Sequence, residues 1–116
     1  MRRVAFPRAE LGPGGRRVVL AGRREILVID DRGTLRALFN RCPHRQAPLT
    51  AGPLRKSRLP APVGGIEYDR ERQVLLCPWH RYEFDLESGR CPADPQKLRV
   101  ATYEVRVEGD EIAVYV

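Results

Sequence analysis

The chain has 116 residues, which fits one domain, and its 42% hydrophobic and 31% charged residues are an ordinary globular balance. The net charge of +6 comes from arginines in scattered short pairs, which favours an ordinary solvated surface. Because only 7% of residues are aromatic, an acidic protein partner is the better functional interpretation of this charge, and we expect no nucleic acid. No apolar run approaches the roughly 20 residues of a membrane helix, and Pro7 interrupts the basic start before a signal core develops. We therefore expect a cytoplasmic protein without a membrane partner.

The first 40 residues are dominated by short runs rich in Val, Ile and Leu, separated by turn signals at Gly22 and at the sequence DDRG. Such runs predict an antiparallel meander. In chain order we expect a short helical turn at 8–11, a loop at 12–15, and strands at 18–21, 25–30 and 35–39.

The middle of the chain, residues 42–95, has a different character. It holds eight of the ten prolines and shows little long alternation, so we expect an irregular insertion between β-rich ends. Within it, residues 65–76 predict a hairpin that turns near 69–71, and residues 58–65 are the most loop-like part.

The C-terminal residues 103–116 alternate apolar and polar side chains around the turn sequence EGDE, and they form the clearest predicted hairpin. The whole chain is therefore expected to be one all-β domain, 1–116. Its β-rich base would comprise about 1–40 and 96–116, with the inserted segment at about 41–95.

Both histidines of the chain closely follow a cysteine, in the sequences CPH and CPWH. Thiolate and imidazole are strong ligands for soft and borderline metals, and this spacing lets one short loop present both groups. The proline after each cysteine stiffens its loop. The sequence thus predicts one metal site, formed by Cys42, His44, Cys77 and His80.

Two kinds of centre fit this ligand set. Two cysteines and two histidines can hold a tetrahedral zinc ion, or a [2Fe-2S] cluster in which histidines replace two cysteines on one iron. Zinc fingers pair Cys with Cys and His with His along the chain, whereas each loop here supplies one of each. That order favours the cluster, and a structural zinc module that binds a protein partner remains the alternative.

The pattern C-x-H followed by C-x-x-H in an antiparallel β domain resembles the Rieske family. The similarity is most specific at CPHRQAPL (42–49) and CPWHRYEFDLESG (77–89), and weaker similarity covers nearly the whole chain. The resemblance implies a Rieske-like antiparallel β-sandwich with an inserted cluster-binding subdomain. It also implies a [2Fe-2S] cluster with one iron on the two cysteines and the outer iron on the two histidines.

The resemblance is closer to ferredoxins that feed bacterial oxygenases than to high-potential respiratory members. The latter carry an extra cysteine in each loop and hydrogen-bond donors near the cluster. Neither loop here has the extra cysteine, and the donor positions hold Tyr82 and Phe84, of which Phe84 cannot donate. We expect a reduction potential near the bottom of the roughly −150 to +300 mV Rieske range.

The expected function is that of a soluble one-electron carrier between a reductase and a terminal oxygenase or related oxidoreductase. No histidine is left for a mononuclear oxygenase iron, and no nicotinamide or flavin fingerprint appears, so the chain is not expected to be an enzyme by itself. A fixed small subunit of a nitrite-reductase-like complex is the variant of this hypothesis.

Three features depart from the family pattern or stand outside it. Thirty-two residues (77 − 44 − 1) separate His44 from Cys77, so residues 52–72 are expected to add a hairpin or loop, as a tolerated surface insertion more than a partner-specific lid. Arg81 occupies a position where glycine is usual, and a positive φ there would strain it. Cys91 is left over and is expected to be an inert small hydrophobe.

Overall fold

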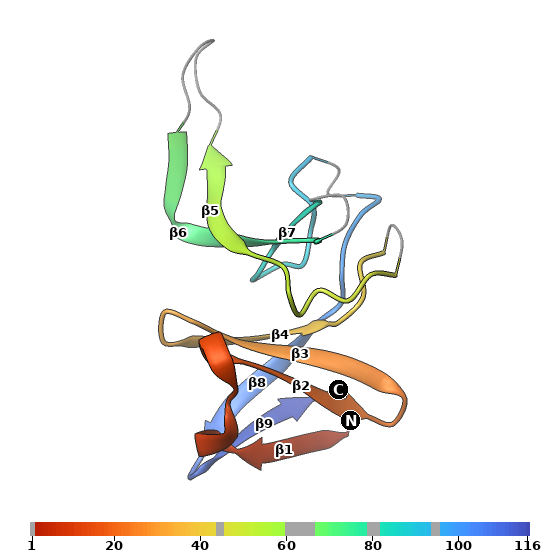
Figure 1. Cartoon of the computed structure of the whole chain (residues 1–116), viewed down its shortest axis with the longest axis vertical. Helices are drawn as coiled ribbons and strands as arrows, with labels where there is room; N and C mark the ends of the chain where they lie inside the picture. The colour runs from red at the N-terminus through yellow and green to blue at the C-terminus, as the bar shows by residue number, and fades with distance from the viewer. Residues whose placement is uncertain (1, 44–45, 60–66, 79–81, 94–95) are drawn as a thin grey trace.

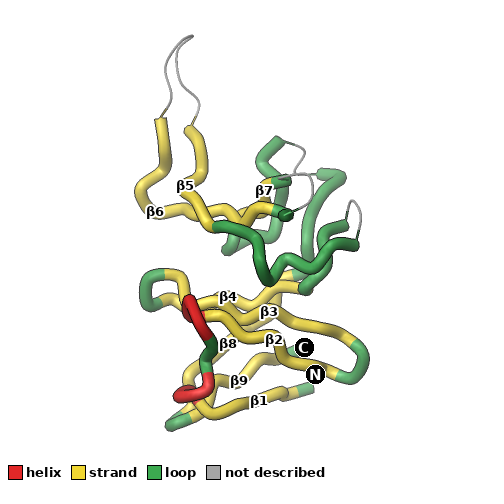
Figure 2. The backbone as a smooth tube through the Cα atoms, viewed as in Figure 1, coloured by secondary structure: helices red, strands yellow, loops and turns green. Residues whose placement is uncertain are grey.

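The computed structural model describes residues 2–43, 46–59, 67–78, 82–93 and 96–116, and it is an all-β structure (Figures 1 and 2). Two short 3-10 turns, Arg8–Glu10 and Pro13–Gly15, accompany its strands. The strands are β1 (Arg3–Pro7), β2 (Arg16–Ala21), β3 (Arg24–Asp31), β4 (Thr34–Phe39), β5 (Leu54–Leu59), β6 (Glu67–Leu76), β7 (Glu83–Asp85), β8 (Thr102–Glu108) and β9 (Glu111–Tyr115). Within the described ranges, no helix has the length and apolar character needed to cross a membrane.

Six strands form one antiparallel sheet, the base sheet, in the order β1-β9-β8-β4-β3-β2. The predicted meander is confirmed as β2-β3-β4, and the predicted C-terminal hairpin as β8-β9, which turns at Gly109 with φ +61°. The sequence did not predict β1, which pairs with β9 and sets Phe6 opposite Ile112. The edge strands β1 and β2 approach each other, so the base sheet curls around its own core.

Strand β3 is buried on both faces. Its residues 26–29, the sequence ILVI, are fully buried. Alternate residues face opposite sides of a strand, and here Ile26 and Val28 join the core inside the base sheet, while Leu27 and Ile29 join a second core above it. A continuous apolar run of this length is typical of a strand covered on both faces.

The second core lies under a smaller antiparallel sheet in the order β5-β6-β7. The predicted hairpin within 65–76 is wrong, because Glu67–Leu76 is one strand, β6, whose partner is β5. The expected turn at 69–71 contains no glycine or asparagine to adopt the positive φ of a tight hairpin turn.

The middle of the chain is therefore not irregular throughout, because it contains the three strands of this smaller sheet. The extra segment 52–72 contributes to the antiparallel pair of strands β5 and β6. This agrees with the expectation that the segment adds a hairpin or loop. These strands extend away from the rest of the molecule (Figure 1). Residues 60–66, which include most of the predicted loop 58–65, lie outside the described residues.

Candidate metal centre

Both predicted cysteine ligands are buried in the second core. Cys42 follows β4 of the base sheet and is 0% exposed, while Cys77 directly follows β6 of the smaller sheet and is 1% exposed. The same core includes the fully buried side chains of Phe84 and Leu49. The structure thus brings the two thiols, one from each sheet, into one water-excluding environment.

Each cysteine begins a loop that is closed by a backbone hydrogen bond of the same type. The N–H of Cys42 donates to the carbonyl oxygen of Ala47 at 2.8 Å, and the N–H of Cys77 donates to that of Tyr82 at 2.8 Å. Each bond joins residues five positions apart and encloses a segment that contains one histidine. Sequences of different internal spacing, CPH and CPWH, are therefore held in two matched loops.

The histidines themselves, His44 and His80, lie outside the described residues, as does Arg81. Their assignment as ligands, and the strain expected at Arg81, remain predictions. A positive φ is present in the first loop at Gln46, at 60°, where its N–H donates to the carbonyl oxygen of Cys42 at 2.7 Å. Among described residues, no three Cys, Asp or Glu side chains gather into a metal site of their own.

The chain after the first loop is fixed to the base sheet by two polar side chains. The buried Oδ1 of Asn40 accepts hydrogen bonds from the N–H of Leu49 at 3.0 Å and from the hydroxyl of Thr50 at 2.9 Å. Arg16 of β2 donates through Nη1 to the carbonyl oxygens of Thr50 at 2.7 Å and Gly52 at 2.6 Å. Partial burial lowers the pKa of Arg16 from its ordinary value because desolvation disfavours the charged form.

Gly52 connects the first loop to the second. A Cβ at this position would lie 1.9 Å from the carbonyl oxygen of Leu76, the residue before Cys77. The N–H of Leu76 also donates to the carbonyl oxygen of Pro53 at 2.9 Å. Only glycine permits this approach, so the arginine and asparagine contacts on the first loop also position the strand that leads into the second.

The chain after the second loop is held by a buried carboxylate. Asp85, at 5% exposure, accepts the N–H groups of Glu87 at 2.8 Å and Ser88 at 2.9 Å on Oδ1. Gly89 follows with φ +75°, and its missing Cβ leaves room for the carbonyl oxygen of Val100, which would otherwise be 2.1 Å away. These contacts give a structural role to the sequence FDLESG that follows the second histidine.

The remaining cysteine, Cys91, is 1% exposed and belongs to the same core as the two predicted ligands. Its burial agrees with the expected role as a small hydrophobic residue. Sequence reasoning missed Arg16, Asn40 and Gly52. A glycine and an asparagine beside a cysteine loop are detectable signals, but nothing in the sequence connects Arg16 to residues more than thirty positions away.

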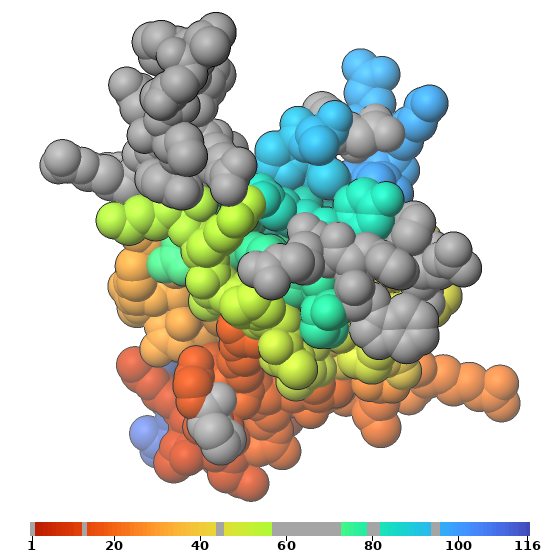
Figure 3. Space-filling model, turned by 45° about the horizontal axis from the view of Figure 1, so that its top comes forward, coloured from red at the N-terminus to blue at the C-terminus, as the bar shows by residue number. Residues whose placement is uncertain are grey.

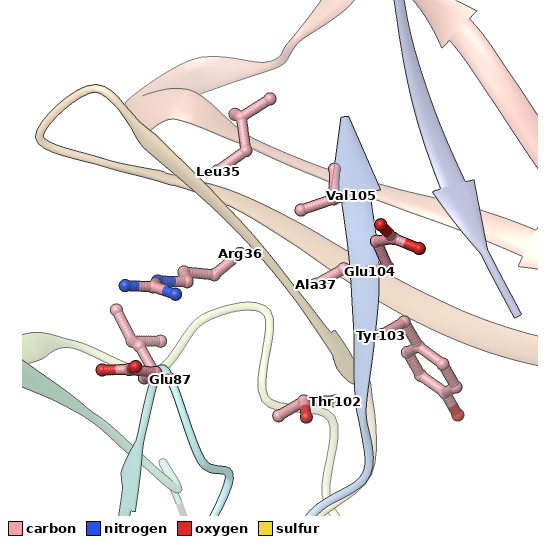
Figure 4. A pocket seen from close by; sticks show the side chains of 9 residues that line it. Leu35, Arg36, Ala37, Glu87, Thr102, Tyr103, Glu104 and Val105 are labelled. Atoms are coloured by element: carbon pink, nitrogen blue, oxygen red, sulfur yellow. The ribbon is translucent and has the colours of Figure 1, made fainter. Parts of the chain in front are cut away.

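The two sheets are separated on one side by a hollow of about 240 Å³ between β4, β8 and the turn after β7. Figure 4 shows Arg36 of β4 extending toward the turn that carries Glu87. The buried Nε of Arg36 has no hydrogen-bond partner among the described residues.

The donor chemistry fits an iron–sulfur centre. Buried thiolates are ligands of [2Fe-2S] clusters, imidazoles replace two of them in the mixed form, and both residue types occur in the matched loops. The apolar side chains around the two sulfurs exclude water. A further hydroxyl beside the core is that of the half-buried Tyr82.

The chain was compared with protein-family models and with curated proteins. A family model described as the Rieske [2Fe-2S] domain matches residues 2–104. Apoptosis-inducing factor 3 of Mus musculus is 27% identical over 105 residues, which are 90% of this chain and 15% of the relative. The chain therefore spans only a small part of the curated relatives that it matches first.

Solved structures match along almost the entire chain. The ferredoxin of carbazole 1,9a-dioxygenase from Nocardioides aromaticivorans IC177 is 28% identical, with a TM-score of 0.71 and coverage of 98% of this chain and 97% of that one. An NADH-dependent nitrite reductase small subunit from Mycobacterium tuberculosis has a TM-score of 0.71 at 23% identity, covering 98% and 96%. A complex of reduced oxygenase and oxidized ferredoxin in carbazole 1,9a-dioxygenase matches with a TM-score of 0.65 at 23% identity, covering 94% and 96%.

Proposed function

The chain belongs to the Rieske [2Fe-2S] domain family, and on this premise we propose that it is a one-electron carrier between two other proteins. A bound [2Fe-2S] cluster supplies the one-electron chemistry. The residues proposed to hold the cluster are Cys42, His44, Cys77 and His80.

The observation that carries this proposal is the pair of matched loops. Each begins at a buried cysteine and is closed by the same 2.8 Å backbone bond around a segment that contains a histidine. The chain's own contribution is to hold the thiols in an apolar core and to fix both loops through Arg16, Asn40 and Gly52. Such fixed, desolvated ligand loops are suited to electron transfer, which needs little rearrangement.

The described surroundings support a potential near the bottom of the roughly −150 to +300 mV Rieske range. Phe84 is fully buried beside the cysteines and has no hydrogen-bond donor, while each cysteine N–H is already engaged in closing its loop. Fewer donors toward the sulfurs stabilise the added electron less, which lowers the potential.

We propose a terminal oxygenase and a reductase as the partners. The supporting relative is the carbazole dioxygenase ferredoxin, which is 28% identical and matches over nearly the full length of both chains. A second candidate, a fixed small subunit of a nitrite-reductase-like complex, is supported by the full-length structural likeness to such a subunit. In either role the chain passes electrons and contributes no catalytic site of its own.

The test is an EPR spectrum of anaerobically purified, dithionite-reduced protein, with iron and zinc quantified in the same sample. We expect about two irons per chain and the rhombic signal of a cluster with mixed Cys and His ligands. One zinc and no iron, also after iron–sulfur reconstitution, would replace the proposal by the zinc module. His44→Cys and His80→Cys variants that still assemble a cluster should have lower potentials, and an unchanged potential would remove that histidine from the ligand set.

The two candidate roles differ in how tightly the chain binds its partner. A shuttle must dissociate between turnovers, so its complexes should be weakened by moderate salt. A fixed subunit should instead elute with its partner during purification from the native source at all salt concentrations. Gel filtration of the native extract at low and high salt, followed by EPR on the fractions, distinguishes these outcomes.

A further inference from the structure

We propose that an exposed pair of arginines beside the second cysteine loop is the docking point for an acidic surface of the electron-transfer partner. The pair is Arg90 and Arg99, with Lys97 next to it, and we call these three residues the basic ribbon. This inference rests on the proposed electron-carrier function and specifies the chemistry of its partner.

Arg90 and Arg99 lie directly opposite each other as an isolated antiparallel bridge. The backbone bonds on either side join the N–H of Cys91 to the carbonyl of Leu98 at 2.9 Å and the N–H of Val100 to that of Gly89 at 2.8 Å. The arginines therefore form a non-hydrogen-bonded pair, in which the Cα atoms are about 4.5 Å apart and the side chains are nearest. Both side chains project from the same face of the ribbon.

This arrangement places two positive charges together, with no ion pair to a described residue that compensates them. Arg90, Lys97 and Arg99 are exposed, and none forms an ion pair with another residue of the described ranges, although Glu87 is an exposed acid on the adjoining turn. Elsewhere the structure pairs arginines with acids, for example Arg41 with Glu25 at 2.6 Å. Like charges in opposed positions destabilise a β pair. Exposed like charges whose side chains form no described ion pair are free to attract a negatively charged partner.

The basic ribbon borders the chain that follows the second cysteine loop. The carbonyl of Arg90 accepts the N–H of Asp85 at 2.9 Å, three residues after Tyr82 closes the second cysteine loop. The next residue, Cys91, is buried in the core that contains Cys42 and Cys77. Figure 3 shows the blue segment that carries the ribbon protruding at the same end of the molecule as the smaller sheet. A partner bound here would lie next to the cysteine loops.

The chemistry of the ribbon favours a protein carboxylate over other anions. Two adjacent guanidinium groups can each bind a carboxylate through two parallel hydrogen bonds. The described residues of 86–100, the segment that carries the ribbon, include no aromatic side chain on which a nucleic-acid base could stack. The ribbon has three cations, whereas polybasic membrane-binding segments use clusters of about 4–8.

The test compares two double variants of the cluster-loaded protein that carry the same net charge, +4 (6 − 2). Arg90→Gln/Arg99→Gln removes the ribbon pair, and Arg8→Gln/Arg23→Gln removes two exposed arginines of the base sheet region. The probe is a short oligoglutamate peptide, titrated calorimetrically at low salt. We expect binding to weaken about tenfold in the ribbon variant and to change by less than about twofold in the control. Equal losses in both variants, or none in the ribbon variant, would overturn the proposal.

The nature of the occupant is tested with two further probes at the same salt concentration. We expect single-stranded DNA and phosphatidylserine vesicles to bind the wild type without dependence on Arg90 and Arg99. If either probe loses more affinity than oligoglutamate in Arg90→Gln/Arg99→Gln, the ribbon recognises that anion and the acidic-protein assignment is wrong.

The free protein provides an independent measurement. Because the like charges repel, Arg90→Gln should raise the melting temperature at low salt, and the gain should shrink at high salt. A lower melting temperature in this variant would show a structural role for the pair and overturn the proposal. A normal EPR signal in the wild type together with no effect of the ribbon variant would overturn the docking proposal alone. A missing EPR signal in the wild type would instead contradict the proposed function, on which the docking proposal rests.

Discussion

The base sheet and the cysteine region, residues 40–100 with strands β5 to β7, are stabilised in different ways. The base sheet is organised by apolar periodicity, with residues such as Ile26, Val28 and Ile112 almost completely buried in its core. The cysteine region shares the other face of β3, but its loops are positioned by single polar side chains and close backbone approaches. Many interchangeable apolar contacts stabilise the base sheet, whereas a few specific contacts position the loops of the cysteine region.

This difference predicts where substitutions do harm. An apolar core tolerates changes of shape if its volume is kept. A loop held by Arg16, Asn40 and Gly52 has no such redundancy, because each contact satisfies a particular backbone group. The cysteine region should therefore depend on its bound centre and its anchors, while the base sheet folds without either.

The largest effect is expected from removing a cysteine ligand. Cys42→Ala or Cys77→Ala should abolish iron binding, because a thiolate ligand is lost, and the stability contributed by the bound centre is lost with it. Iron content and hydrogen exchange measure both effects. We expect faster exchange at residues 74–78 and 82–86. Protection should be retained at residues 26–29, since these pack into both cores.

The matched control is Cys91→Ala, which alters a third buried cysteine of the same core. It should keep the full iron content and lose about 1 kcal/mol of stability through the smaller buried side chain. Loss of iron in this variant would place Cys91 among the ligands. Retention of iron in Cys42→Ala would remove Cys42 from them.

The next largest effect is expected at the contact between the two loops. In Gly52→Ala the new Cβ would lie 1.9 Å from the Leu76 carbonyl, so the backbone must separate there. We expect a loss of more than about 2 kcal/mol in chemical denaturation. Gly14→Ala serves as control, because Gly14 has open space around it and only its φ of +70° is unfavourable, at about 1 kcal/mol. Equal losses of stability in Gly52→Ala and Gly14→Ala would show that the close approach of Gly52 to the Leu76 carbonyl is not the cause.

A smaller effect is expected from the arginine anchor. Arg16→Met keeps an apolar stem but leaves the carbonyl groups of Thr50 and Gly52 without their donor, which should cost about 1–3 kcal/mol. The same variant removes a positive charge near the first loop, so the reduction potential should fall. Denaturation and redox titration measure the two effects. Arg23→Met, at an exposed turn position, should change neither.

The sequence predicted those features that repeat along the chain or that chemistry restricts to few residue types. Short runs rich in Val, Ile and Leu located β2, β3 and β4, and alternation located β8 and β9. The strand patterns predicted the all-β fold, and the resemblance at the two Cys–His motifs predicted the family and the [2Fe-2S] cofactor, with which the family comparison agrees. The histidine ligands still stand as predictions.

The sequence could not predict contacts that depend on the folded arrangement. β5, with the sequence LRKSRL, has little apolar alternation and becomes a strand by pairing with β6. β1 ends in Pro7 and pairs with a strand more than a hundred residues away. Arg16 contacts carbonyl groups 34 and 36 residues later, and no local pattern encodes such a pair. Long-range pairings of weakly patterned segments were thus the main source of error.

The smallest expected effect lies in the base sheet and depends on pH. A hydrogen bond from the Tyr115 hydroxyl, at 2.5 Å, and the charge of Arg3, at 2.8 Å, lower the pKa of Glu108 below its ordinary value. A lowered folded-state pKa stabilises the protein above the unfolded-state pKa of about 4.3, and this contribution disappears as pH falls through the folded-state value.

Glu108→Gln should therefore lower the melting temperature slightly at pH 7. The difference from wild type should shrink as the pH falls below the unfolded-state pKa and vanish below the lowered folded-state pKa. Thermal denaturation from neutral to acidic pH measures this, with Glu111→Gln as control, since Glu111 contacts Arg3 only at 3.4 Å. Because Glu108 lies on β8, far along the chain from both cysteines, iron content should stay unchanged. A pH-independent difference would assign the effect to packing, and lost iron would mean that the base sheet and the cysteine region are not independently stabilised.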